Sequence, residues 1–256
     1  MSSIIGCFSS CHSSFDSVIK VIMKNKKIAI IPAAGMGIRM GFNIPKQFLL
    51  LNDIPILALT LMVFQESEHI DHIIVVVPKD EIKRCEEDII KRYEITKAYK
   101  VVAGGDRRQD SVRLGLYAAK QIADDNDIIL IHDGVRPFIR KELIADIVEE
   151  AKKHPAVIVG IPAKDTVKEV DKDGYVINTL VRDRIWLIQT PQVFRFKEIL
   201  YAHEKAYSEG WQGITDDAML LERLGVSVKV IKGSEDNIKI TTPSDLRVAE
   251  YLLKKN

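Results

Sequence analysis

Continuous apolar stretches of strand length alternate with longer amphipathic stretches from residue 27 to the C-terminus. The apolar stretches are rich in β-branched residues, which is typical of strands covered on both faces. The predicted strands are residues 27–32, 72–78, 99–105, 127–133, 156–162 and 226–231, and the predicted helices are 54–65, 80–93, 110–122, 141–154, 196–209, 215–224 and 243–254. Thr242 is the expected cap of the last helix, with Pro243 in its first turn. This alternation predicts an α/β fold with a Rossmann-like, doubly wound and mostly parallel sheet.

Residues 164–192 interrupt the alternation. They form two extended patterns around Asp171-Lys172-Asp173-Gly174, a sequence with the turn chemistry of a β-hairpin. We therefore expect a β-arm at about residues 164–188, inserted into one domain that covers residues 23–256. A chain of 256 residues fits such a single domain.

The first 22 residues differ in composition from the rest of the chain. They are rich in serine, begin without basic residues and contain no long apolar stretch, so they make a poor secretory signal. We expect residues 1–22 to be a disordered extension outside the core, or to precede the true start codon. A targeting segment is the alternative.

Charge and cysteine content narrow the class of protein. Lys and Arg number 37 against 36 for Asp and Glu, so the net charge of +1 creates no global field that would attract nucleic acid. No apolar run approaches the roughly 20 residues that span a bilayer, so we expect no membrane partner. The three cysteines, Cys7, Cys11 and Cys85, have no metal-ligand spacing and leave one thiol unpaired, which favours a reducing, cytoplasmic location.

The segment after the first predicted strand has the chemistry of a phosphate-binding loop. It reads PAAGMGIRMGFNIPKQF and ends at Phe48. Gly35 and Gly37 allow a tight turn that presents N–H groups to phosphate oxygens, and Arg39 and Lys46 supply positive charge. The pattern is neither G-x-G-x-x-G nor G-x-x-x-x-G-K-[ST], which disfavours dinucleotide-binding and P-loop proteins. A plain β–α turn would need no such pair of cations.

PAAG-x-G-x-R-M followed by PKQF resembles the signature of the 2-C-methyl-D-erythritol 4-phosphate cytidylyltransferase family of nucleotidyltransferases. Matching motifs follow in order: GGDRRQDSV (104–112), HDGVRPF (132–138), KDT (164–166), QTPQ (189–192), TDDA (215–218) and DNIKIT (236–241). They cover nearly all of the chain from residue 27. The resemblance implies transfer of CMP from CTP to 2-C-methyl-D-erythritol 4-phosphate, giving 4-diphosphocytidyl-2-C-methyl-D-erythritol and pyrophosphate, a step of non-mevalonate isoprenoid precursor biosynthesis.

The resemblance also implies a set of residues for the nucleotide. The implied CTP site consists of Pro32, Ala33, Ala34, Gly35, Gly37, Arg39, Lys46, Gly105, Asp106, Ser111, Asp133 and Gly134. In it Gly105 and Ser111 read the cytosine, although a turn glycine and an N-cap at Asp110 or Ser111 would explain the same pattern. Asp133 follows a wholly apolar strand, at the edge where Mg²⁺ or the ribose needs an oxygen ligand. His132 is expected to be packed and hydrogen-bonded rather than catalytic.

The second substrate is a phosphate monoester and needs cations and hydroxyl donors of its own. The implied acceptor site consists of Arg136, Thr166, Arg182, Thr190, Thr215 and Lys239, and the implied catalytic residues are Arg39, Lys46, Arg182 and Lys239. Exposed charged positions would explain Arg182 and Lys239 equally well without the resemblance. In the family the inserted arm crosses to a second subunit, so a homodimer is expected in which Thr166 and Arg182 complete the partner's site.

Three alternatives remain at this stage. Gly134-Val135 stands where the family often has two alanines, which leaves ribitol 5-phosphate as a possible acceptor, whereas PAAG in place of LAGG favours methylerythritol phosphate. An NAD-dependent reductase would fit the fold but lacks the glycine fingerprint. A non-catalytic nucleotide-binding protein would keep the CTP pocket but has little reason to retain Arg136, Arg182 and Lys239 together.

Overall fold

The computed structural model describes residues 25–35 and 44–255. The predicted extension at residues 1–22, together with Gly37 and Arg39 of the phosphate loop, lies outside the described residues. No helix in the described part of the chain is long and apolar enough to cross a membrane.

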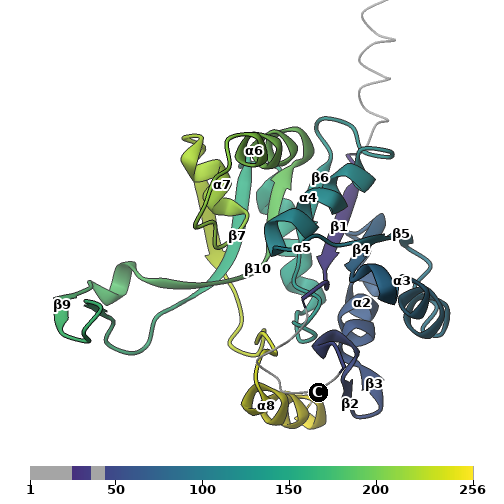
Figure 1. Ribbon diagram of the computed structural model, residues 1–256, viewed down its shortest axis with the longest axis horizontal. Helices are drawn as coiled ribbons and strands as arrows, with labels where there is room; N and C mark the ends of the chain where they lie inside the picture. Colours follow the sequence, from purple (N-terminus) through teal and green to yellow (C-terminus); the bar gives the residue numbers. More distant parts are fainter. Residues whose placement is uncertain (1–24, 36–43, 256) are drawn as a thin grey trace, which may run out of the picture.

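A seven-stranded sheet forms the centre of the molecule, with the strand order β11-β7-β10-β6-β1-β4-β5 (Figure 1). Its strands are β1 (Lys27–Pro32), β4 (His72–Val77), β5 (Ala98–Ala103), β6 (Ile128–Ile131), β7 (Ala156–Pro162), β10 (Trp186–Arg195) and β11 (Val228–Lys232). All pairings are parallel except those of β10, which runs antiparallel to both β6 and β7. The predicted mostly parallel α/β sheet is thereby confirmed, and the predicted strands agree with the observed ones within about two residues at each end.

Helices cover both faces of the sheet. They are α2 (Ile56–Glu66), α3 (Ile82–Arg84), the wide-turn helix η4 (Cys85–Lys91), α4 (Arg108–Ala119), α5 (Lys141–Ala151), α6 (Phe196–Ser208) and α7 (Ala218–Arg223). One buried cluster joins one sheet face to α2, η4 and α5, and a second joins the opposite face to α4, α6 and α7. Strand β6 is buried along its whole length, and β1 and β4 are buried except at one end residue each, which explains why these sequences are almost continuously apolar.

Strand β10 is the main element that sequence reasoning did not place. The sequence predicted two extended segments outside the alternation, but the second of them continues into the sheet between β6 and β7. Its buried part includes Gln189, Thr190 and Gln192, which are 6%, 5% and 1% exposed. Polar residues are uncommon in a central strand, and the side chains of these three are satisfied by tertiary hydrogen bonds. The local sequence therefore gave no signal that this extended segment enters the sheet.

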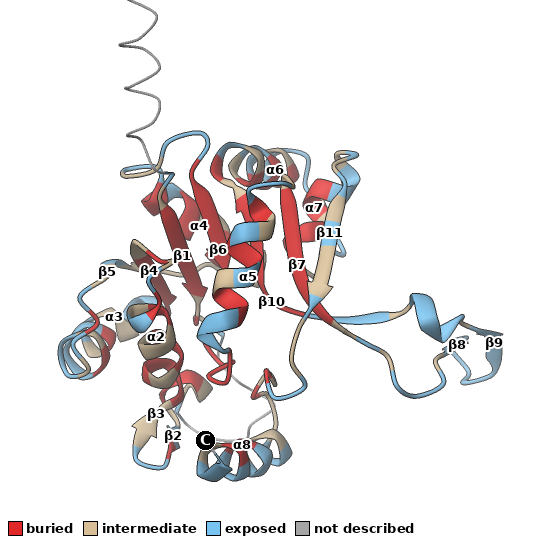
Figure 2. Ribbon diagram, turned by 180° about the vertical axis from the view of Figure 1, so that it is seen from behind, coloured by how far each residue is buried: buried red, intermediate tan, exposed pale blue. Residues whose placement is uncertain are grey.

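The hairpin at the tip of the arm was predicted correctly. Strands β8 (Lys168–Val170) and β9 (Val176–Thr179) are joined through Gly174, whose φ of 88° suits glycine. The Asp171 carboxylate accepts a hydrogen bond from the backbone N–H of Tyr175 at 2.9 Å. The arm projects from the body as a long exposed extension (Figure 2).

The last helix, α8 (Pro243–Lys255), packs beside a small strand pair formed by β2 (Leu50–Leu51) and β3 (Ile54–Pro55). Its predicted cap is present, because Thr242 Oγ1 accepts from the N–H of Asp245 at 3.2 Å and the Asp245 carboxylate accepts from the N–H of Thr242 at 2.8 Å. The segment leading into the helix is tied down as well, since Ile240 N–H donates to Val135 O at 2.9 Å. These contacts carry Lys239 to the carboxyl ends of the strands. The short 3-10 turns η2 (Lys46–Phe48), η3 (Lys79–Glu81) and η5 (Arg182–Arg184) complete the described elements.

Candidate active site

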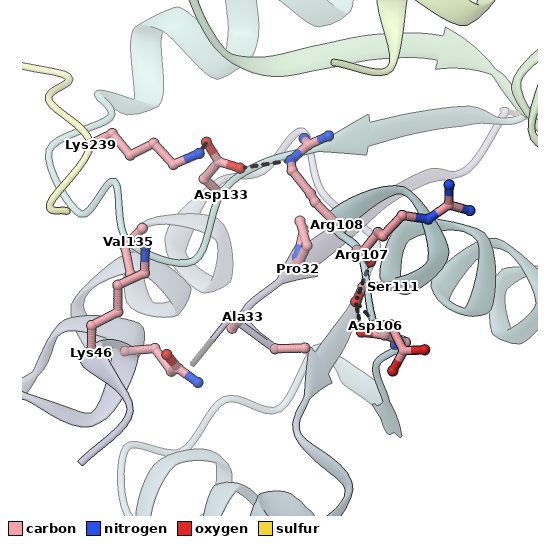
Figure 3. A pocket seen from close by; sticks show the side chains of 14 residues that line it. Pro32, Ala33, Lys46, Asp106, Arg107, Arg108, Ser111, Asp133, Val135 and Lys239 are labelled. Atoms are coloured by element: carbon pink, nitrogen blue, oxygen red, sulfur yellow. Dashed lines mark hydrogen bonds and ion pairs between the residues drawn. The ribbon is translucent and has the colours of Figure 1, made fainter. Parts of the chain in front are cut away.

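A pocket lies at the carboxyl ends of β1, β5 and β6, the edge where ligands bind in open α/β sheets (Figure 3). Of the residues predicted for CTP, those that line it are Pro32, Ala33, Ala34, Gly35, Lys46, Gly105, Asp106, Ser111 and Asp133. Gly134 is buried behind them, and a methyl group added there would come within 2.9 Å of Ala33 Cβ and 3.1 Å of Leu57 Cδ1. The fold thus brings four separate sequence segments to one cavity.

The turn after β5 packs closely against neighbouring residues and is hydrogen-bonded to one hydroxyl. A methyl group on Gly104 would lie 2.3 Å from Ala34 Cβ, and one on Gly105 would lie 2.6 Å from Asp110 Cβ, so both positions require glycine. Ser111 Oγ accepts from Gly105 N–H at 3.2 Å. The N-cap of α4 is Arg107, so the alternative in which Asp110 or Ser111 caps this helix is wrong.

A second pocket adjoins the first. Of the residues predicted for the acceptor, those that line it are Arg136, Thr190, Thr215 and Lys239. Arg108, Asp133 and Lys239 line both pockets and therefore form the boundary between them. Thr166 and Arg182 lie on the exposed arm instead, where Arg182 Nη1 donates to Lys164 O at 3.1 Å.

Three cations surround the carboxylate of Asp133, which is 5% exposed. Lys239 Nζ lies 2.9 Å and Arg136 Nε 3.3 Å from Oδ2, and Arg108 Nε lies 3.2 Å from Oδ1. Burial on its own raises the pKa of the Asp133 carboxyl, but Arg108, Lys239 and Arg136 together hold it well below the usual range. The site therefore carries a surplus of positive charge around one ionised carboxylate, an arrangement suited to anionic substrates.

His132 has a structural role, as expected from the sequence. Its Nε2 lies 3.0 Å from Arg136 O, and because a carbonyl only accepts, Nε2 carries the proton. Nδ1 then accepts from Thr190 Oγ1 at 3.1 Å, and the same hydroxyl accepts from Asp133 N–H at 3.1 Å. Burial lowers the pKa of His132 to about 4, although its hydrogen bond to Arg136 O acts in the opposite direction. This chain of hydrogen bonds fixes the backbone of Asp133 and occupies the Thr190 hydroxyl.

A protein-held metal site does not fit the residues described. No group of three or more His, Cys, Asp or Glu side chains in residues 25–35 and 44–255 could hold a metal ion. Asp133, the predicted ligand, already faces three cations. The Asp133 carboxylate could contact a metal ion only while it also pairs with these cations, so a substrate would have to supply most of the ligands.

The sequence predictions gave no role to Arg108, a half-buried arginine that lines both pockets, or to Asp217, the buried carboxylate that it contacts. Arg108 lies between Asp133 and Asp217, with Nη1 2.8 Å from Asp217 Oδ2. Asp217 is 1% exposed and comes from the loop before α7. The sequence places Arg108 inside the motif GGDRRQDSV and Asp217 inside TDDA, which could have marked both as candidates. Their contact joins residues 109 positions apart and is visible only in the fold.

Comparisons with known proteins identify similar chains. Residues 27–255 match a family model described as 2-C-methyl-D-erythritol 4-phosphate cytidylyltransferase. A protein of that name from Geobacter metallireducens is 49% identical over 227 residues, covering 89% of this chain and 97% of the relative. One from Clostridium novyi is 44% identical over 230 residues, covering 90% and 97%.

Solved structures agree with these relatives. The structure of 4-diphosphocytidyl-2C-methyl-D-erythritol synthase from Anaerococcus prevotii superposes with a TM-score of 0.77 at 35% identity, covering 90% of this chain and 96% of that one. The 2-C-methyl-D-erythritol 4-phosphate cytidylyltransferase of Francisella tularensis gives 0.74 at 35% identity, covering 88% and 99%.

Proposed function

Since the chain belongs to the 2-C-methyl-D-erythritol 4-phosphate cytidylyltransferase family, we propose that it transfers CMP from CTP to 2-C-methyl-D-erythritol 4-phosphate. The products are 4-diphosphocytidyl-2-C-methyl-D-erythritol and pyrophosphate. The relatives described above carry the methylerythritol name, which favours this acceptor over ribitol 5-phosphate. The pair of adjoining pockets that meet at Asp133 and Lys239 is the geometric observation that supports the reaction.

The proposed step is an in-line displacement at the α-phosphorus of CTP. The acceptor phosphate is already an anionic nucleophile near neutral pH, so positioning and charge stabilisation suffice. An oxygen of the acceptor phosphate forms the new bond to the α-phosphorus while the bond to pyrophosphate breaks. CTP would occupy the pocket lined by Lys46 and Ser111, and the acceptor the pocket lined by Arg136 and Thr215. Lys46, with Arg39 from the phosphate loop, would stabilise the charge that builds on the reacting phosphorus and the leaving pyrophosphate.

We propose that the reaction uses a divalent cation. Mg²⁺ would neutralise charge on the triphosphate, and CTP oxygens would be its main ligands, because Asp133 is the one predicted ligand and is shared among three cations. Asp133 would touch either this ion or the ribose. Pyrophosphate release with and without a chelator, followed by addition of Mg²⁺, measures this requirement.

We also propose a homodimer in which Thr166 and Arg182 complete the partner's acceptor site, and the exposed arm is the feature that supports it. Its exposed apolar side chains include Val176, Ile177 and Leu187, at 58%, 62% and 55% exposed. Covering such a patch is a common reason for association. We expect Val176→Asp to shift the chain toward monomer in sedimentation velocity and to lower activity most at low protein concentration. Val248→Asp, at a 48% exposed position on α8, is the matched control.

The cytoplasm is the proposed location. Cys85 is a free, buried thiol, and unpaired thiols are usual in reducing compartments. Cell fractionation with an antibody against the chain tests the location.

The function itself is tested by mixing the purified chain with CTP and acceptor and measuring pyrophosphate. We expect release with 2-C-methyl-D-erythritol 4-phosphate and much slower release with ribitol 5-phosphate. Faster release with ribitol 5-phosphate would favour that acceptor. CTP binding without release in either reaction would favour the non-catalytic nucleotide-binding protein.

A further inference from the structure

Arg108 lies at the boundary of the two pockets but has no part in the mechanism described above. Its side chain lines both cavities together with Asp133 and Lys239. Figure 3 shows these three residues in the first of the two pockets. The side chain is 29% exposed, so it faces both the protein interior and the space for substrates. In an in-line reaction the α-phosphorus of CTP must lie between the attacking oxygen of the acceptor and the leaving pyrophosphate, and so where the two pockets meet, which is the place that these three residues border.

The guanidinium of Arg108 joins two carboxylates. Its Nε lies 3.2 Å from Asp133 Oδ1, and its Nη1 lies 2.8 Å from Asp217 Oδ2. Asp217 is held from other directions as well, since its Oδ1 lies 3.2 Å from His203 Nε2 and its N–H donates to Gln192 Oε1 at 3.0 Å. Arg108 is therefore anchored on the side away from the pockets.

The three cations around Asp133 differ in their second contacts. Arg136 Nη1 donates to Asn237 O at 2.8 Å, and Arg108 contacts Asp217. For Lys239, whose side chain is 36% exposed, Asp133 is the ion-pair partner within the residues that the structure describes. Lys239 is thus the cation that can leave Asp133 with the smallest loss of contacts.

We propose that Arg108, anchored by Asp217, is a positioning residue that keeps the Asp133 carboxylate compensated while Lys239 turns from it to a substrate phosphate. A buried carboxylate that loses a partner is costly unless other cations remain. With Arg108 and Arg136 in place, Asp133 keeps two guanidinium partners when Lys239 moves. The inference rests on the proposed cytidylyl transfer.

Removing Arg108 should hold Lys239 on Asp133 and slow the chemical step. We expect Arg108→Gln to lower the single-turnover rate at saturating substrates roughly tenfold to hundredfold, the range for loss of a charged hydrogen bond. The dissociation constant of CTP should stay close to the wild-type value. Asp217→Asn, which keeps the shape but removes the anchoring charge, should lower the rate by a smaller factor.

Arg223→Gln is the matched control. Arg223 is an exposed arginine of α7, and its Nη2 donates to Gln212 O at 3.0 Å, outside both pockets. It should keep the wild-type rate, and its melting temperature reports what the loss of an exposed arginine of α7 does to folding alone.

Chemical rescue separates positioning from folding. In Arg108→Ala, millimolar guanidinium should restore part of the rate, because it can enter from the pocket, whereas urea, which has a similar shape and no charge, should not. A wild-type rate in Arg108→Gln overturns the proposal. So does a loss that follows the melting temperature and is not rescued by guanidinium, or failure of both the Arg108 and Asp217 variants to fold, since each assigns the pair to folding. If the wild-type chain itself releases no pyrophosphate, the proposed function has failed instead.

Discussion

The pocket at the strand ends and the projecting arm differ in how far their charged residues are buried and paired. Around the pocket, Asp133 and Asp217 are nearly inaccessible to solvent, and each has cationic partners within the same chain. On the arm, Arg182 is exposed and apolar residues such as Ile177 and Leu187 face solvent. The described residues of both pockets therefore come from one chain, whereas the arm holds Thr166 and Arg182 away from the two pockets.

Burial decides how strongly charges act in the two regions. Charges near the pocket interact in a medium of low effective dielectric constant, so removing one has a large effect. Exposed charges on the arm are screened, and an exposed ion pair contributes little on its own. A large effect at Arg182 thus requires that another subunit or a substrate covers it.

The largest effect is expected from Lys46→Ala. Lys46 lines the nucleotide pocket, and its charge should matter most when the reacting phosphorus and pyrophosphate gain negative charge. Loss of one such transition-state contact lowers the rate by about 100- to 1000-fold. A single-turnover experiment combined with a CTP titration measures the rate and the affinity separately. Lys229→Ala, on the exposed side of β11, is the control. An unchanged single-turnover rate would contradict this role.

The buried His132 should make the pocket region sensitive to acid. Its folded-state pKa of about 4 lies below the unfolded value of 6.5, so the unfolded chain binds the extra proton between these values. Stability from the neutral imidazole is complete above pH 6.5 and is lost as the pH falls to 4, by about 3 kcal/mol for a shift of this size. The stability that the ionised Asp133 carboxylate contributes is lost only at lower pH, because the pKa of this carboxyl is depressed in the folded chain.

Urea unfolding at a series of pH values measures this loss. His132→Gln should be less stable than the wild type at pH 7, since hydrogen bonds to Thr190 and Arg136 are weakened. Its free energy of unfolding should then change less between pH 6.5 and 4. Equal slopes for the two proteins would mean that His132 does not control this range.

The next largest effect concerns the arm. Arg182→Ala should raise the KM of the acceptor roughly tenfold to hundredfold, which corresponds to about 1.5 to 3 kcal/mol for a charged hydrogen bond, and leave the KM of CTP nearly unchanged. Arg184→Ala changes a neighbouring exposed arginine of the same short turn and should have a much smaller effect. Equal effects of the two substitutions would point to general charge on the arm rather than to a specific contact.

Mixing two impaired variants, assayed at a low acceptor concentration, tests whether the arm acts across subunits. Arg182→Ala and Lys239→Ala damage one acceptor site from two chains if the arm crosses, so a mixed dimer would contain one intact site and one doubly damaged site. Partial recovery of activity is expected once labelled subunits have exchanged. Exchange without any recovery would place Arg182 in its own chain's site.

The smallest effect is expected from deletion of residues 1–22. The match to the family begins at residue 27, and the first strand contributes Ile28, Ile30 and Ile31, each 0% exposed, to the core. Melting temperature and pyrophosphate release should therefore be unchanged. Deletion through residue 31, which removes these side chains, should prevent folding. Loss of soluble protein from the shorter deletion would contradict the expectation.

The periodicity of apolar residues was sufficient to predict a helix or strand wherever that element is stabilised by its own apolar residues. Examples are the strands at residues 27–32 and 72–77 and the amphipathic helices α5 and α6, whose buried residues are apolar at the expected positions. Helix α2 begins two residues later than predicted, because Ile54 and Pro55 pair as β3. The signal failed for β10, whose Gln192 donates to Asp216 and accepts from Asp217 N–H.

By itself the sequence determined the alternating α/β order, the hairpin and the motifs that carry the family resemblance. These features depend on residues close together in the chain, through side-chain periodicity, glycine conformation and turn chemistry. Only the tertiary structure decided that β10 enters the sheet, that His132 and Thr190 hold the backbone of Asp133, and that Arg108 joins Asp133 to Asp217. Such contacts exist because residues far apart in sequence must satisfy one another's charges and hydrogen bonds once burial has removed water.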